Sequence, residues 1–217
     1  MEILKLLPPD TRVELKKPNR LEKLICRNPF EIKKVLGISK QQLSRYKTGK
    51  SRLTIKQLDR LSNSFGFEWK NNISNFGLEA SYHKIKLPNK LEISDNIAWL
   101  LGFHTTENSE TPKSFGICNS EITLIKKSKD ALIELKIPQE IMKIEVRYIE
   151  NNQKQKTLKE VHKHLRDLDI RFRKLNKNSL TKKPLFTLRV SSRLIRDLLK
   201  NLEMHFISNH RITKENW

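Results

Sequence analysis

Apolar residues between positions 21 and 65 recur at the spacing of an α-helix, and helix breakers interrupt them. Pro29, Gly37 and Gly49 divide this region into short amphipathic helices. Their apolar positions are Leu21, Leu24, Ile25, Phe30, Ile32, Val35, Leu36, Leu43, Tyr46, Leu53, Ile55, Leu58, Leu61 and Phe65. The pattern predicts an all-α first domain.

Beyond residue 90 the pattern changes to a mixture of helices and strands. Apolar and polar positions alternate in 114–119, 143–150, 170–173 and 185–190, which is typical of strands. Amphipathic helices are predicted between them, near 120–135 and 158–168, and again after Ser191 or Ser192. We therefore predict an α+β domain in which helices cover the apolar face of an antiparallel sheet. The outer face would carry Arg147, Arg171, Arg173 and Arg189.

Turn-forming residues separate the two patterns. Gly, Asn, Ser and Pro are frequent between Gly66 and Lys90, with only brief apolar pairs. Trp69 and Phe76 are the two aromatic residues that we expect to attach this segment to a neighbouring domain. The predicted organisation is a helical domain at 1–66, a linker at 67–90 and the α+β domain at 91–217.

The most specific local pattern in the helical domain is a pair of helices joined by a tight turn. Phe30 to Leu36 reads as a helix, and Gly37 fits a left-handed C-cap. Ser39 is followed three residues later by Gln42, which predicts a capping box for a second helix over Ser39 to Thr48. The second helix should bury Leu43 and Tyr46 and leave its other side chains facing solvent.

This pair of helices resembles the helix-turn-helix of the lambda-repressor-like (Cro-type) family, including Gly49 after the second helix. The resemblance implies that the second helix enters the major groove of double-stranded DNA. Gln41 suits a bidentate contact with adenine and Arg45 one with guanine. The alternative is that the module serves dimerisation or docking. Carried over by position, the predicted base contacts are Lys40, Gln41, Ser44 and Arg45, and the predicted phosphate contacts are Thr48 and Lys50.

The overall charge is strongly basic. The 217 residues include 44 Lys and Arg against 24 Asp and Glu, a formal net charge of +20. Such an excess favours double-stranded DNA as the partner, because each Lys or Arg placed at a phosphate releases condensed counterions. An anionic membrane surface is the weaker alternative. No apolar run approaches the length of a membrane-spanning helix, so we expect no membrane partner.

The second domain begins with a helix over Asp95–Glu107. Ser94 and Asp95 are available as N-cap acceptors, and no breaker follows. Gly102 and Thr106 lie four residues apart, so they share one helix face and leave room for a second helix to approach closely. Glu107 ends the run. Read without any family in mind, this is a buried helix that ends on an acid.

The run from Leu100 to Asn108 resembles the signature helix of the LAGLIDADG homing-endonuclease family. Leu100, Gly102 and Glu107 match, whereas His104, Thr105, Thr106 and Asn108 depart from the signature. The resemblance implies packing of two such helices and delivery of Glu107 as a catalytic, Mg²⁺-binding carboxylate. It also implies a saddle-shaped sheet laid along the major groove, with the outward Arg147, Arg171, Arg173 and Arg189 in contact with DNA. One chain offers one such acid, so cleavage of DNA would need a homodimer formed through the Asp95–Glu107 helix. It would otherwise need a longer two-motif protein, which the echo of Ile93–Trp99 at Ile212–Trp217 suggests.

Two other functions stay open at this stage. A non-catalytic transcriptional regulator would use the endonuclease scaffold only to read DNA, and an RNA-splicing maturase would bind structured RNA, which we expect less than duplex DNA. Cys26 and Cys118 form neither a metal motif nor a disulfide framework, which indicates a reducing, intracellular setting. For a DNA-binding protein we expect a cytoplasmic, nucleoid-associated location. The six histidines show no metal-binding spacing and are expected to be structural or surface residues.

Overall fold

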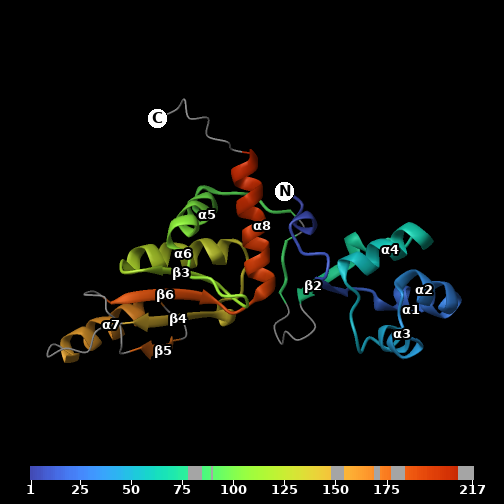
Figure 1. The fold of residues 1–217 in the computed structure, drawn as a ribbon, viewed down its shortest axis with the longest axis horizontal. Coiled ribbons are helices and arrows are strands. Elements are labelled where there is room, and N and C mark those ends of the chain that lie inside the picture. Colours follow the sequence, from blue (N-terminus) through green and yellow to red (C-terminus); the bar gives the residue numbers. More distant parts are fainter. Residues whose placement is uncertain (78–84, 89, 148–153, 169–171, 177–183, 210–217) are drawn as a thin grey trace. The chain divides into compact units, whose positions relative to one another are not determined.

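The chain forms two compact units. The computed structural model describes residues 1–217 except 78–84, 89, 148–153, 169–171, 177–183 and 210–217, so the echo at Ile212–Trp217 lies outside the described residues (Figure 1). Leu7–Leu87 form one unit, which we call the insert unit. Met1–Leu6 and Pro88–Trp217 form the other, the terminal unit. The insert unit therefore interrupts the sequence of the terminal unit, whereas we predicted consecutive domains at 1–66 and 91–217.

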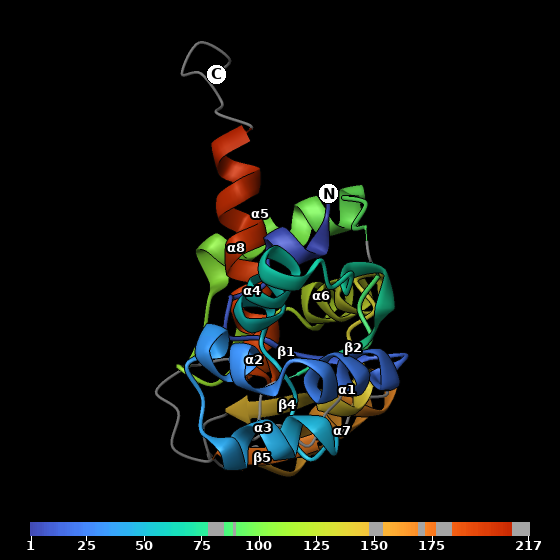
Figure 2. The same ribbon diagram turned by 90° about the vertical axis from the view of Figure 1, so that its right-hand side faces the viewer.

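Among its described residues, the insert unit contains four short helices and a two-stranded antiparallel sheet (Figure 2). Each helix buries one stripe of the predicted apolar positions. Ile32, Leu58 and Leu61 are fully buried, and Tyr46 is 3% exposed. The elements are β1 (Arg12–Leu15), α1 (Pro18–Arg27), α2 (Pro29–Leu36), α3 (Lys40–Lys47), α4 (Ile55–Phe65), the 3-10 turn η2 (Lys70–Asn72) and β2 (Ile73–Gly77).

Most of the predicted linker belongs to the insert unit. β2 pairs with β1, from Arg12 opposite Gly77 to Leu15 opposite Ile73. The prediction of an all-α domain was therefore wrong. Trp69 and Phe76 are buried within it, at 1% and 2% exposed. Asn72 holds the start of α1, because its side-chain oxygen accepts the Lys17 N–H at 3.1 Å. A segment that reads as loop by composition is thus fixed by long-range pairing.

The terminal unit is a mixed helix and sheet structure. Its sheet has the order β3-β6-β4-β5 (Figure 1). α6 contacts β3 and β6, and α5 contacts α6, α8 and β3. Ile117, Ile144 and Leu188 form the centre of the apolar sheet face and are fully buried. The elements are η1 (Ile3–Lys5), α5 (Asp95–Glu107), β3 (Phe115–Asn119), α6 (Ile122–Glu134), η3 (Gln139–Ile141), β4 (Met142–Arg147), α7 (Lys154–Leu168), β5 (Phe172–Asn176), β6 (Leu185–Val190) and α8 (Arg193–Asn209).

We predicted an antiparallel sheet, but the sheet contains one parallel pair of strands. β4 pairs antiparallel with β6 but parallel with β5, with a bulge between Ile144 and Glu145. α7 lies between β4 and β5 in the sequence, and two parallel strands need such a crossover connection. The helix over 158–168 was predicted, but its consequence for strand direction was not. α6 begins after Glu121, and of the two serines predicted to precede the last helix, Ser192 accepts the Ile195 N–H.

The first six residues are part of the terminal unit. Met1 and Leu91 exchange two backbone hydrogen bonds of 2.8 Å each. Ile3 is fully buried, and Asn201 on α8 donates from its side-chain nitrogen to the Leu6 carbonyl oxygen at 2.7 Å. The chain leaves the terminal unit after residue 6 and returns at residue 88, so two connections join the units.

Truncation of Ile3 tests this arrangement. Ile3→Ala is expected to destabilise the terminal unit by about 2–5 kcal/mol, because it opens a cavity at a fully buried position. Hydrogen exchange should therefore accelerate in β6 and α8 and stay unchanged in α2 and α4. Faster exchange in α2 and α4 instead would show that the N-terminal residues stabilise the insert unit.

Candidate nucleic-acid interface

The turn between α2 and α3 is fixed by backbone geometry at both ends. Gly37 ends α2 with φ +63°, in the left-handed region that favours glycine. The Ile38 N–H then donates to the Lys33 carbonyl at 3.2 Å, and Ile38 is buried. Ser39 begins α3, and its hydroxyl oxygen accepts the Gln42 N–H at 3.1 Å. These contacts set the direction of α3 relative to α2.

α3 presents one polar face to solvent. Leu43 and Tyr46 point inward and are buried, as predicted. The Tyr46 hydroxyl accepts from the Gln42 amide at 3.1 Å and lies 3.4 Å from Gln57 on α4, so it ties α3 to α4. Gln42 therefore serves Tyr46, and only the Ser39 half of the predicted capping box is present. The residues predicted to contact bases, Lys40, Gln41, Ser44 and Arg45, are all exposed.

The loop after α3 also exposes the residues predicted to contact phosphates. Thr48 is the C-cap of α3, and its hydroxyl donates to the Ser44 carbonyl at 3.0 Å. Gly49 follows with φ +69°. Lys50 is exposed and makes no ion pair with another described residue. Of the two predicted phosphate contacts, Lys50 thus has the more available donor.

The charge around α3 is of one sign. Residues 32–58, which run from α2 through α3 into α4, contain eight Lys and Arg and no Asp or Glu. The insert unit as a whole has 18 Lys and Arg against 7 Asp and Glu. Such a surface attracts a polyanion and contributes affinity that does not depend on sequence. The exposed amide of Gln41 and guanidinium of Arg45 add groups that can read base edges.

The sheet of the terminal unit corrects one predicted contact. Arg189 is 7% exposed, because β6 is flanked by β3 and β4 and the loop before β3 folds over it. Its Nη1 donates to the Ser109 carbonyl and to the Ser114 hydroxyl, each at 3.1 Å. Its Nε lies 3.3 Å from Glu145. Arg189 is therefore a buried structural residue in this unit and not part of an exposed face.

Of the other three arginines of the predicted face, Arg147 alone has a described side chain. Arg147 ends β4 and is exposed, as predicted. Arg171 lies outside the described residues. Arg173 belongs to β5, at the bulge opposite Ile144 and Glu145, and the structure describes its backbone but not its side chain. A surface with four arginines is therefore reduced to Arg147 among the residues that the structure describes.

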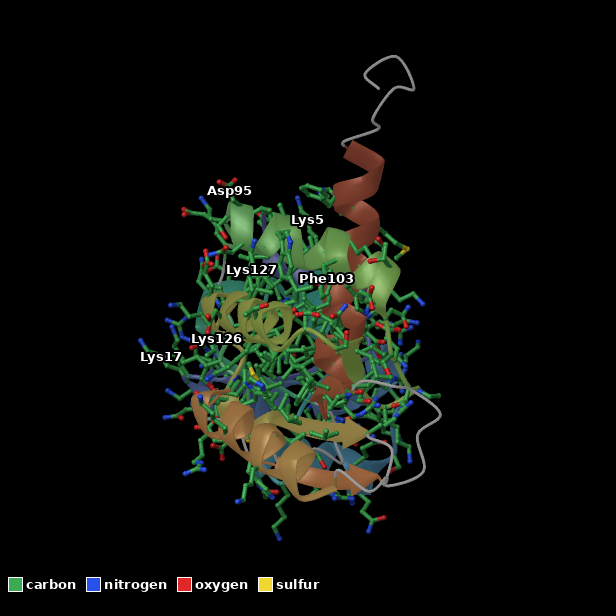
Figure 3. All side chains as sticks on the ribbon, turned by 90° about the vertical axis from the view of Figure 1, so that its left-hand side faces the viewer. Lys5, Lys17, Asp95, Phe103, Lys126 and Lys127 are labelled. Carbon is green, nitrogen blue, oxygen red and sulfur yellow. The ribbon has the colours of Figure 1, made fainter. Side chains whose placement is uncertain are left out.

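α5 has the predicted bounds and a face that no described side chain covers. The Ser94 hydroxyl caps it by accepting the Ile97 N–H at 3.3 Å. Gly102 and Thr106 are exposed, and a Cβ added at Gly102 would meet no atom within 4 Å. The rings of Trp99 and Phe103 stack with their centroids 4.8 Å apart, and the Lys127 ammonium lies 4.3 Å from the centroid of the Trp99 ring. Phe103 on α5 and Lys127 on α6 are labelled in Figure 3.

The acid and the histidine of this helix point in different directions. Glu107 is partly exposed at the C-terminal end of α5 and has no hydrogen bond or ion pair with another described residue. His104 is 4% exposed and lies between Glu110 and Glu203, 3.3 Å from each. It also stacks on Phe115. His104 is thus a structural residue, as predicted, and it faces the interior.

The described residues do not assemble a metal centre by themselves. No group of three or more His, Cys, Asp or Glu among them is arranged to hold a metal ion. Glu107 is a single carboxylate, whereas Mg²⁺ is bound through several oxygen ligands. The Mg²⁺ that the LAGLIDADG resemblance implies therefore does not fit one copy of the described chain, and no catalytic step can be built on it.

Comparison with known proteins identifies one part of the chain. No curated protein and no solved structure matches the chain. None of the helices in the described part combines the length and the apolar character needed to cross a membrane. The family comparison gives no evidence for a LAGLIDADG domain. Residues 31–69, which contain the α2–turn–α3 pair, match the family described as Helix-turn-helix, so this segment is a lambda-repressor-like helix-turn-helix domain, a type that binds double-stranded DNA.

Proposed function

We propose that the protein binds double-stranded DNA in a sequence-specific manner by placing α3 in the major groove. The exposed face of α3 supports this proposal most directly, because it groups Lys40, Gln41 and Arg45 on a helix whose direction is fixed by the turn and by Tyr46. Lys50, exposed in the loop after α3, would contact a phosphate beside these bases. Recognition of this type needs a rigid helix with free donors at its surface.

Selection of bound duplexes from a random library tests sequence preference. A shared base pattern of a few base pairs should emerge, and affinity for the selected duplex should exceed that for random DNA by at least 10³-fold. The logarithm of affinity should fall linearly with the logarithm of salt concentration, since Lys and Arg displace counterions. Binding that does not respond to salt, or a selection that returns no pattern, would refute the proposal.

A second candidate function is DNA cleavage by a homodimer formed through α5. Two observations favour it. Gly102 and Thr106 offer an uncovered small-residue face, and the Glu107 carboxylate sits without a described partner at a helix C-terminus, where the helix dipole disfavours an acid. In a dimer, two such carboxylates would lie at the ends of paired helices. The terminal unit would then hold a metal site that a single copy lacks.

The selected duplex can separate this candidate from a purely regulatory role. The protein and a Glu107→Gln variant are incubated with that duplex and Mg²⁺, and strand cleavage is measured. Cleavage by the parent protein alone would establish an endonuclease that requires Glu107. Equal binding by both proteins without cleavage would leave a DNA-binding regulator in which Glu107 is only the last residue of α5.

A further inference from the structure

The insert unit has a second basic surface that is separate from α3. A groove of about 420 Å³ lies between α1 and the C-terminal end of α4, and we call it the α1 groove. Arg20, Lys23 and Arg27 line one side, and Phe65 and Phe67 line the other. No residue of α3 contributes to its lining. The groove is therefore not an extension of the recognition helix itself.

The three cations form one stripe. Arg20, Lys23 and Arg27 fall at helix positions i, i+3 and i+7, so they share a face of α1 and span about 10 Å along it. All three are exposed, and none makes an ion pair with another described residue. Glu68 is the one acid in the lining. The helix dipole explains a cation in the last turn, Arg27, but not the other two.

A further feature beside the groove favours an anion. Asn28 lines the groove and precedes α2, but no side chain caps the N-terminus of α2. Pro29 has no N–H, so the free amide groups at the start of α2 are those of Phe30 and Glu31. The helix dipole adds to the attraction for an anion, and the Glu31 carboxylate in the first turn opposes it. Three cations and two free amide groups thus adjoin a groove whose described lining contains a single acid. This combination fits a ligand that carries negative charges at regular intervals.

We propose that the α1 groove is a second, sequence-independent contact for the phosphodiester backbone of DNA, outside the base pairs that α3 reads. The inference rests on the proposed function, because it assigns the groove to the same partner. The guanidinium groups of Arg20 and Arg27 can bind phosphate oxygens, like carboxylates, in a bidentate geometry, and DNA is favoured because the helix-turn-helix of the same unit implies that partner. The 18 to 7 excess of basic residues in the insert unit also favours a polyanion.

The test compares a variant that lacks the three positive charges of the stripe with a control variant of the same net charge. The groove variant carries Arg20→Gln, Lys23→Gln and Arg27→Gln. The control variant carries Arg60→Gln, Lys70→Gln and Lys86→Gln, which removes the same charge from exposed residues outside both the groove and the basic segment 32–58. Affinity is measured at several salt concentrations for the selected duplex and for the same duplex extended by random flanking sequence.

We expect the groove variant to lower the slope of log affinity against log salt by about 2–3 on the extended duplex, since each phosphate contact contributes about 0.9. Its affinity should fall about tenfold or more, while its base preference is unchanged. The control should change the slope by less than about 1. Equal effects of both variants, or a parental slope in the groove variant, would overturn the proposal, and the latter would favour an acidic protein as the occupant.

Two further measurements separate a failure of the groove proposal from a failure of the proposed function: a conservative variant and binding to random DNA. Arg20→Lys with Arg27→Lys retains the charges, so it should keep the parental slope, and a loss of slope would contradict a role of charge in the groove. If selection shows no sequence preference, the proposed function fails. The groove is then tested on random duplex alone, where a difference between the groove and control variants would support it and equal slopes would refute it.

Discussion

Arg45→Ala is expected to weaken binding to the selected duplex by about 1–3 kcal/mol, which corresponds to roughly 5- to 150-fold. Arg45 is exposed near the end of α3, and α3 is held in place by its buried residues Leu43 and Tyr46. Loss of the guanidinium should therefore remove a contact without moving the helix. Selection repeated with the variant should show relaxed preference at one or two adjacent base pairs and the parental pattern elsewhere.

Lys47→Ala provides the matched control for Arg45→Ala. Lys47 is the last residue of α3 and is also exposed, but it is not among the predicted base contacts. Its loss should reduce affinity for selected and random duplexes by the same factor and leave base preference unchanged. If Arg45→Ala behaved in the same way, α3 would contribute only charge, and sequence would have to be read elsewhere in the protein.

The helix-turn-helix could be predicted from sequence because its signals are local. Gly37, Ser39 and Gly49 each act on residues within one helical turn, and the structure gives all three the expected role. Gln42 is the exception. Its side chain has two partners within reach, its own N-cap and Tyr46 one turn later, and the structure shows the contact with Tyr46. The spacing of residues alone does not determine which of its two nearby partners the Gln42 side chain contacts.

The sheet of the terminal unit shows where the alternation of residues stops being informative. Alternation correctly placed Arg147 and Arg189 on the face opposite Ile144 and Leu188, and β4 and β6 pair in the register this requires. It could not show what covers this face. β6 and β4 both have a strand on each side, but Arg189 is enclosed by Ser109 and Ser114 of the loop before β3, whereas Arg147 at the end of β4 stays exposed. The contacts that enclose Arg189 join residues that are distant in sequence.

The division of the chain also depends on distant contacts. Asn72 and Ser74 read as loop residues by composition, yet Asn72 holds the start of α1 and the Ser74 hydroxyl donates to the Glu14 carbonyl at 3.0 Å. The pairing of Met1 with Leu91 spans 90 residues and has no sequence signature. Amide and hydroxyl side chains suit both exposed turns and such buried contacts, so composition could not distinguish the two.

The enclosure of Arg189 depends on a glycine opposite it. Gly116 on β3 pairs with Arg189 on β6, and the Ser109 N–H donates to the Gly116 carbonyl at 2.9 Å. A Cβ at Gly116 would lie under 3.0 Å from the Ser109 carbonyl oxygen, a separation that real Cβ atoms essentially never show, and 3.4 Å from Arg189 Nη1. The contact is with backbone, so a side-chain rotation cannot relieve it. The absence of a side chain at residue 116 lets Ser109 approach and accept from Arg189.

Gly116→Ala is therefore expected to destabilise the terminal unit by about 2–5 kcal/mol, because it displaces Ser109 and leaves the buried guanidinium of Arg189 with fewer acceptors. Gly102→Ala is the matched control. Gly102 lies exposed within α5 with no atom near its Cβ position, so alanine should stabilise the helix by about 0.5–1 kcal/mol. Hydrogen exchange of the β3 and β6 amides measures both effects. Equal, small changes in the two variants would show that the loop before β3 yields to the added methyl group, and Arg189 would then not be locked in place by Ser109.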